Sequence, residues 1–160
     1  GVSHGGEMLM KIASEYNGIR AGIATEPASM DYLAQRPSES TTAPSEPQPE
    51  TMEVNTMEMK VAAVVEAREE VDMALAMERI NAVETPILIV SRERDHNRAT
   101  FRLNYELLEE AGKDVEWKAF DHEYHGFFFV QRNADGEYVA DSIQREAVNY
   151  AVSYFARYLK

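Results

Sequence analysis

Residues 1–25 have the sequence GVSHGGEMLMKIASEYNGIRAGIAT, and this stretch decides the fold class. After an opening turn, apolar residues recur at helical spacing, and Asn17 and Gly18 form a typical stop signal for a helix. The small and apolar run at residues 19–25 then predicts a short buried strand, which Glu26 closes. A turn, a helix and a buried strand in this order indicate a parallel sheet covered by helices.

The first five residues match the pattern G-x-S-x-G, with serine at position 3. This pattern is typical of a nucleophile elbow, a sharp turn from a strand into a helix with the reactive serine at its tip. We expect the small residues at both flanks, Gly1 and Gly5, to let this strained backbone turn without a clash of Cβ atoms. Because the helix directs its first amides at the reacting centre, the backbone N–H of His4 is predicted to donate to an oxyanion. Ser3 is therefore the candidate nucleophile.

The C-terminal part of the chain alternates between strand and helix patterns. Residues 86–90 and 114–120 predict strands, residues 98–111 predict a helix that Gly112 stops, and residues 142–159 predict a last helix. This alternation predicts the α/β class, with a parallel sheet and flanking helices.

A serine nucleophile needs a general base, and the base needs an acid that orients it. For this type of elbow the chain order is serine, acid, histidine. Asp95 follows the predicted strand at 86–90, and His125 follows the predicted strand at 114–120. We therefore predict a catalytic triad of Ser3, Asp95 and His125.

Three short motifs resemble those of the α/β-hydrolase superfamily, and they are closest to its dienelactone-hydrolase and prolyl-oligopeptidase branches. Ser-His-Gly-Gly at 3–6 resembles the elbow of acylaminoacyl-peptidase-like members, and Tyr-His-Gly-Phe at 124–127 resembles their histidine loop. Arg-Glu-Arg-Asp-His at 92–96 resembles their Gly-x-x-Asp loop, with Arg92 where a glycine is usual. We expect this departure to affect loop geometry rather than chemistry.

The resemblance covers residues 1–30 and 85–160, and it implies that residues 1–160 form the C-terminal part of an α/β-hydrolase domain. In such a mechanism Ser3 attacks an acyl carbonyl, His125 transfers the proton, and Asp95 orients His125. The implied activity is that of a serine hydrolase acting on carboxylic esters, or on short acyl-peptides like the prolyl-oligopeptidase branch. The alternative is a non-catalytic fragment or interaction subunit that keeps the triad residues without a working site.

Residues 31–84 separate the two resembling segments and differ in composition. Four of the six prolines lie here among Ser, Thr, Glu and Gln, which predicts a mobile loop over residues 37–50. Residues 57–80 then predict one long acidic helix, because no Gly or Pro interrupts them. Hydrolases of this fold carry lids and caps at this place, so the insertion is a candidate cap.

The composition excludes several other functions. The 16 Lys and Arg against 28 Asp and Glu give a net charge of −12, which repels nucleic acids and acidic membrane surfaces. The absence of cysteine excludes disulfides, cysteine-ligated metals and a thiol nucleophile. His122 and His125 lack a third ligand at a defined spacing, so we expect no metal, and we expect no cofactor.

The expected partners follow from the incomplete hydrolase pattern. The longest apolar runs have four or five residues, far short of the roughly 20 that span a membrane, so we expect a soluble protein and favour the cytoplasm. Only the last three strands of the hydrolase sheet are expected, and the first would expose an apolar edge. We expect this edge to pair with the N-terminal half of the hydrolase or with a second copy of this chain. The expected substrate is a small acyl ester or a short peptide.

Overall fold

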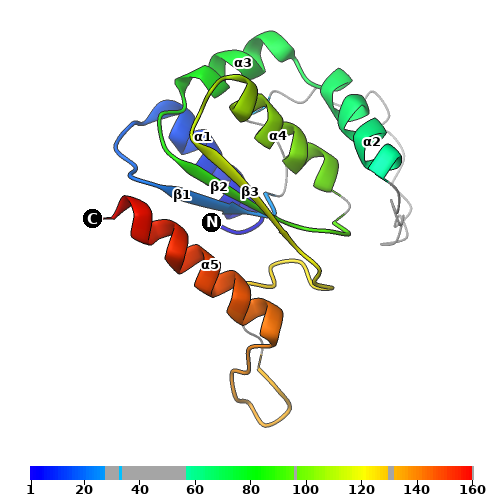
Figure 1. Cartoon of the computed structure of the whole chain (residues 1–160), viewed down its shortest axis with the longest axis vertical. Helices are drawn as coiled ribbons and strands as arrows, with labels where there is room; N and C mark the ends of the chain where they lie inside the picture. The colour runs from blue at the N-terminus through cyan, green and yellow to red at the C-terminus, as the bar shows by residue number, and fades with distance from the viewer. Residues whose placement is uncertain (28–32, 34–56, 96, 130–131, 160) are drawn as a thin grey trace.

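A three-stranded parallel sheet lies between two layers of helices in the computed structural model (Figure 1). The structure describes residues 1–27, 33, 57–95, 97–129 and 132–159. Their elements, in chain order, are α1 (His4–Glu15), β1 (Gly22–Thr25), α2 (Met57–Glu69), α3 (Met73–Ala82), β2 (Ile87–Arg92), α4 (Arg98–Glu110), β3 (Val115–Phe120) and α5 (Ser142–Tyr158).

The sheet has the order β1-β2-β3, and both pairings are parallel. Gly22 lies opposite Ile87, and Ile87 lies opposite Val115. Parallel neighbours need long crossover connections, and α3 and α4 lie within the two connections here. The predicted α/β class, with a parallel sheet and flanking helices, is confirmed.

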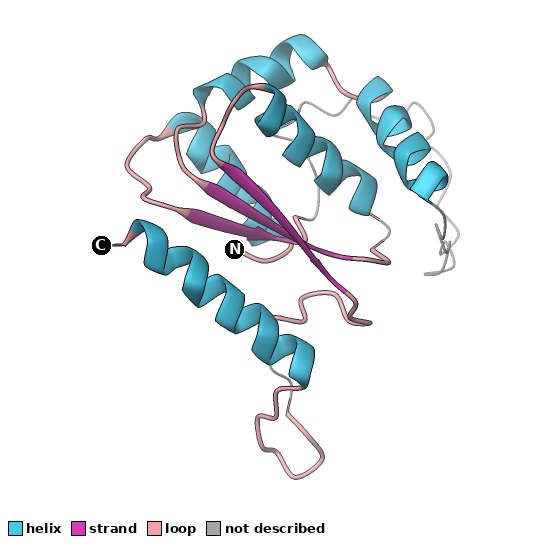
Figure 2. Cartoon of the chain, in the orientation of Figure 1, coloured by secondary structure: helices cyan, strands magenta, loops and turns pink. Residues whose placement is uncertain are grey.

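Both faces of the sheet are covered, as expected for parallel strands. Figure 2 shows α1, α3 and α4 on one side of the sheet and α5 on the other. Side chains of β2 alternate between the two cores: Ile87 and Ile89 pack with α1, α3 and α4, whereas Leu88 and Val90 pack with α5. The sheet is therefore held from both sides, and the loops at its carboxyl edge extend from a rigid base.

Local signals set the helix ends where the sequence predicts them. After α4, Gly112 adopts a φ of +68°, a left-handed conformation that glycine accepts without a Cβ clash. Before α5, the Asp141 side chain accepts from the Gln144 N–H, and the Gln144 side chain accepts from the Asp141 N–H. This capping box satisfies two amides that the first turn of a helix leaves unpaired.

The prediction of one helix over 57–80 is wrong, because two helices, α2 and α3, occupy this stretch. Asp72 is the cap of α3, and its side chain accepts hydrogen bonds from the N–H groups of Ala74 and Leu75. Val71 is buried in the core beside it. An aspartate cap next to a buried valine ends one helix and starts another without Gly or Pro.

The predicted strand at 19–25 is also too long, because β1 has only four residues. The carbonyl of Ile19 instead accepts from the Thr85 hydroxyl at 3.3 Å. The predicted mobile loop over 37–50 lies outside the described residues. Within the described part of the chain, no helix combines the length and apolarity needed to cross a bilayer.

Among the residues that the structure describes, the outer edge of β1 is paired at its carboxyl half. Val2 forms a parallel bridge to Thr25, and the Gly1 amino group donates to the carbonyl of Ile23 at 2.7 Å. An apolar groove of about 320 Å³ follows the rest of this edge, between Leu9 of α1 and Phe155 of α5. Residues 1–3 therefore cover part of the edge that the sequence predicts to be unpaired, all four residues of β1 are buried, and the groove follows the rest of the strand.

Candidate active site

Ser3 lies at a sharp turn between an extended segment and a helix. The residue before it pairs with β1, and α1 begins at the residue after it. Its backbone has φ 53° and ψ −125°, in the left-handed half of conformational space that L-residues rarely adopt. The Ser3 N–H donates to the Thr25 carbonyl at 2.8 Å, which holds this strained conformation in place. Such strain clusters at functional sites, and a strained serine at a turn into a helix is the arrangement that a nucleophile elbow requires.

The close approach around Ser3 involves glycine at one of the two positions that the motif predicts, Gly1, and at Gly6, which lies outside the motif. A Cβ on Gly1 would lie 2.0 Å from the Gly5 carbonyl oxygen, so glycine is required there, as predicted. A Cβ on Gly5 would meet nothing within 4 Å, and the predicted clash at this flank is wrong. The tight contact is at Gly6, whose added Cβ would lie 3.1 Å from the Thr25 carbonyl oxygen, because α1 packs closely on the end of β1.

The backbone N–H of His4 is available as an oxyanion donor. His4 is the first residue of α1, so its amide has no carbonyl one helical turn earlier. The N–H groups of the next two residues already form hydrogen bonds, because Gly5 donates to the Val2 carbonyl and Gly6 donates to the Ser3 carbonyl. The His4 side chain is 76% exposed and lies 3.4 Å from a Glu7 carboxylate oxygen. The role predicted for the backbone N–H of His4 therefore does not involve its exposed side chain.

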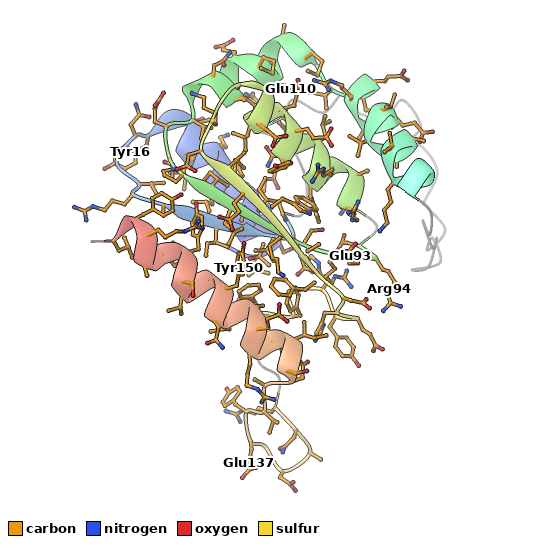
Figure 3. All side chains as sticks on the ribbon, viewed as in Figure 1. Tyr16, Glu93, Arg94, Glu110, Glu137 and Tyr150 are labelled. Carbon is orange, nitrogen blue, oxygen red and sulfur yellow. The ribbon has the colours of Figure 1, made fainter. Side chains whose placement is uncertain are left out.

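Asp95 lies in the loop that follows β2, where the sequence predicts it. Its side chain is fully buried, and Oδ1 accepts from the Asn97 N–H at 2.9 Å. Oδ2 accepts from two nitrogens of Arg92, Nε at 3.0 Å and Nη2 at 2.6 Å. Figure 3 labels Glu93 and Arg94 in this same loop, at the carboxyl edge of the sheet. The acid is thus held rigidly in a single orientation.

His125 lies in the loop after β3 and faces Asp95. Its Nδ1 lies 3.8 Å from Asp95 Oδ2, and its side chain is 42% exposed. Within the described ranges, no hydrogen bond joins the imidazole to the Ser3 hydroxyl. The two loops are nevertheless adjacent, because a Cβ on Gly126 would lie 3.7 Å from Val2 Cγ1. Asp95 and His125 are brought together, and Ser3 lies on the neighbouring turn.

Glu26 is a further member of this cluster that the sequence analysis missed. It follows β1 directly, has a φ of 45°, and its side chain is fully buried. Its Oε2 accepts from the Gly126 N–H at 2.6 Å, and its Oε1 lies 3.8 Å from His125 Nδ1. The sequence position of Glu26 could have indicated it as a site residue, because Glu26 follows a buried strand just as Asp95 does.

Burial raises the pKa of Glu26 above its ordinary value. The Gly126 N–H, His125 and Arg92 oppose this rise, and the charge of Asp95 adds to it. The buried environment of Glu26 therefore disfavours the charged form of its carboxyl group.

Arg92 connects the two acids, and the expectation that it affects loop geometry rather than chemistry stays a prediction. Its Nε lies 2.5 Å from Glu26 Oε1, its Nη2 binds Asp95, and its Nη1 donates to the Glu123 carbonyl at 2.5 Å. Only 10% of its side chain is exposed. The guanidinium is thus a buried countercharge shared by both carboxylates and tied to the histidine loop.

The two histidines considered as metal ligands face different partners. His122 is buried, its Nε2 lies 2.9 Å from Asp141 Oδ2, and its Nδ1 accepts from the Tyr124 N–H. It fastens the histidine loop to the start of α5. Ligand atoms of Glu26, Asp95 and His125 lie within 4.8 Å of one another, which is the spacing of a cation site. The Arg92 guanidinium already supplies positive charge to this cluster.

Helix α2 contacts the loop after β2, at the edge of the sheet that carries these residues. Lys60 Nζ lies 3.3 Å from Glu93 Oε2 in the loop after β2, and Arg98 Nε lies 3.8 Å from the same oxygen. At the other end of α2, Arg68 pairs with Glu110 of α4. The helix therefore lies beside the candidate site. His96, in the resembling motif, lies outside the described residues.

Comparisons with protein-family models, with curated proteins and with solved structures found no match to this chain. Function is therefore inferred from the cluster of Ser3, Glu26, Arg92, Asp95 and His125.

Proposed function

We propose that this chain carries the catalytic residues of a serine hydrolase that cleaves carboxylic esters through an acyl-enzyme on Ser3. The observation that carries the proposal is the backbone of Ser3, which has φ 53° at a turn from an extended segment into the first residue of a helix. A strained serine at this position has its hydroxyl at the tip of the turn, where the helix amides also point. The fold as the C-terminal part of an α/β-hydrolase is part of the same proposal.

The reaction begins with attack of Ser3 Oγ on the acyl carbonyl, while His125 Nε2 accepts the hydroxyl proton. The negative charge that develops on the carbonyl oxygen is stabilised by the His4 N–H. His125 then gives the proton to the leaving alkoxide as the ester C–O bond breaks. Water repeats the sequence on the acyl-enzyme and releases the acid.

The orientation of His125 supports this order of proton transfers. Its Nδ1 faces buried carboxylates at 3.8 Å, which favours a proton on Nδ1 and leaves Nε2 unprotonated. Catalytic hydrogen bonds are often long before substrate binds and shorten in the complex. A small movement of the half-exposed imidazole is sufficient to bring Nδ1, now 3.8 Å away, within hydrogen-bond distance of an acid.

The groove along β1 supports the proposed partner. A strand supplied by the N-terminal half of a hydrolase or by a second copy of this chain would pair with this edge. The same partner would supply the second oxyanion donor. The insertion helix α2, fastened to the site by Lys60 and Glu93, would act as part of a cap.

The proposed activity is tested by comparing p-nitrophenyl acyl esters with N-acetylated aminoacyl p-nitroanilides as substrates. Release of p-nitrophenol that saturates with substrate supports the esterase, and faster release of p-nitroaniline supports the acyl-peptide alternative. If neither product forms above the rate in buffer, in the chain alone or mixed with an N-terminal half, the non-catalytic alternative holds.

A further inference from the structure

His125 has two acids within equal reach, whereas a catalytic triad needs one. Its Nδ1 lies 3.8 Å from Asp95 Oδ2 and 3.8 Å from Glu26 Oε1. The two carboxylates come from the ends of neighbouring strands, β1 and β2, and both side chains are fully buried. The histidine is therefore placed between them rather than directed at one.

The two carboxylates differ in how many donors they already have. Both oxygens of Asp95 accept hydrogen bonds, from Asn97 and from Arg92. Glu26 Oε2 accepts from Gly126, but Glu26 Oε1 receives no hydrogen bond. Arg92 Nε lies 2.5 Å from that oxygen, yet its proton is directed at Asp95. The acceptor with an open lone pair beside His125 Nδ1 therefore belongs to Glu26.

The net charge of the cluster is compatible with a second acid beside His125. Two carboxylates and one buried guanidinium leave a single negative charge, the same as one carboxylate beside a histidine. That charge can neutralise the imidazolium that forms when His125 takes the serine proton. Arg92 thus lets the protein bury two acids here without the cost of an extra uncompensated charge.

We propose that Glu26 is a second orienting acid for His125, so that either Glu26 or Asp95 holds the proton on Nδ1; this rests on the proposed hydrolase function. Glu26 is a positioning residue, because it acts on the reaction only through His125. It also fixes the loop itself by binding the Gly126 N–H, next to the histidine. Glu26 then joins Ser3, Asp95 and His125 as the fourth residue of the proposed catalytic group.

The kinetic test compares Glu26→Gln, Asp95→Asn and the double variant, with Asp121→Asn as the matched control. Asp121 is an exposed carboxylate of the same loop that pairs with Arg94. Each single variant is expected to lower kcat about 10-fold with KM unchanged, and the double variant about 10⁴-fold, the loss typical when a triad acid is replaced. The control should retain the kcat of the native chain.

A purely structural Glu26 would give a different pattern. The amide oxygen of Gln accepts from the Gly126 N–H, so Glu26→Gln would then leave kcat unchanged. A loss of about 10⁴-fold in Asp95→Asn alone would overturn the proposal. If the double variant does not fold, the two single variants decide, because the proposal requires each to lose only about 10-fold in kcat and not about 10⁴-fold.

The ¹⁵N chemical shifts of the His125 ring give a readout that does not depend on activity. The proton is expected on Nδ1 in the native chain and in both single variants, and on Nε2 in the double variant. Transfer to Nε2 in Asp95→Asn alone contradicts the second acid. If the tautomers follow the prediction but no variant hydrolyses ester, the proposed hydrolase function fails while the role of Glu26 stands.

Discussion

The Ser3→Ala and His125→Ala variants are expected to lose ester turnover by about 10⁴-fold or more, because each removes a group on which the other depends. Without the hydroxyl no acyl-enzyme forms, and without the imidazole the hydroxyl keeps its proton. The measurement is the initial rate with a saturating p-nitrophenyl ester, using the preparation in which the native chain is active. Circular dichroism should show an unchanged fold, since both side chains are at least partly exposed.

His4→Ala is the matched control for this experiment. The His4 side chain is 76% exposed, and the proposed mechanism uses only the backbone N–H. Its turnover should stay within a few-fold of the native rate. Persistent hydrolysis in both Ser3→Ala and His125→Ala would refute the mechanism, because neither proposed group would then be needed.

Arg92→Met is expected to lower the free energy of unfolding by about 3–5 kcal/mol, the typical cost of leaving a buried charge without its partner. The variant keeps the aliphatic volume but leaves Glu26 and Asp95 buried without a countercharge. It also removes the hydrogen bond to the Glu123 carbonyl. Urea unfolding followed by Trp117 fluorescence measures the change.

Arg94→Met is the control, since Arg94 and its partner Asp121 are both more than half exposed. Exposed ion pairs contribute roughly 0–1 kcal/mol, so this variant should unfold close to the native midpoint. Equal stabilities of Arg92→Met and the native chain would show that Arg92 is not the countercharge that the two acids require.

The sheet and most helix ends could be predicted because their signals are local. The apolar run from Ile87 to Val90 and the Gly112 stop depend only on residues close in sequence. The break at Asp72 was missed because an uninterrupted helical pattern hides a cap whose partners are the next few amides. The start of β1 was misplaced because the carbonyl of Ile19 accepts a hydrogen bond from Thr85, a residue far along the chain.

The candidate site was predictable only in part. Motif order places Ser3, Asp95 and His125 at turns on one edge of the sheet, where the structure has them, and their catalytic roles remain predictions. Glu26 and Arg92 follow no spacing rule, because their meeting depends on how β1 and β2 pair. A buried arginine shared by acids on two strands is a property of the folded sheet.

The most direct test of the central claim is labelling with a fluorophosphonate, read by intact mass and peptide mapping, with Ser3→Ala as the control. An activated serine forms a covalent phosphonyl adduct, whereas ordinary serines do not. We expect one adduct on Ser3 and none in Ser3→Ala. No adduct on Ser3, in the chain alone or with an N-terminal half added, would contradict the account, since the elbow would then hold a serine that is not activated.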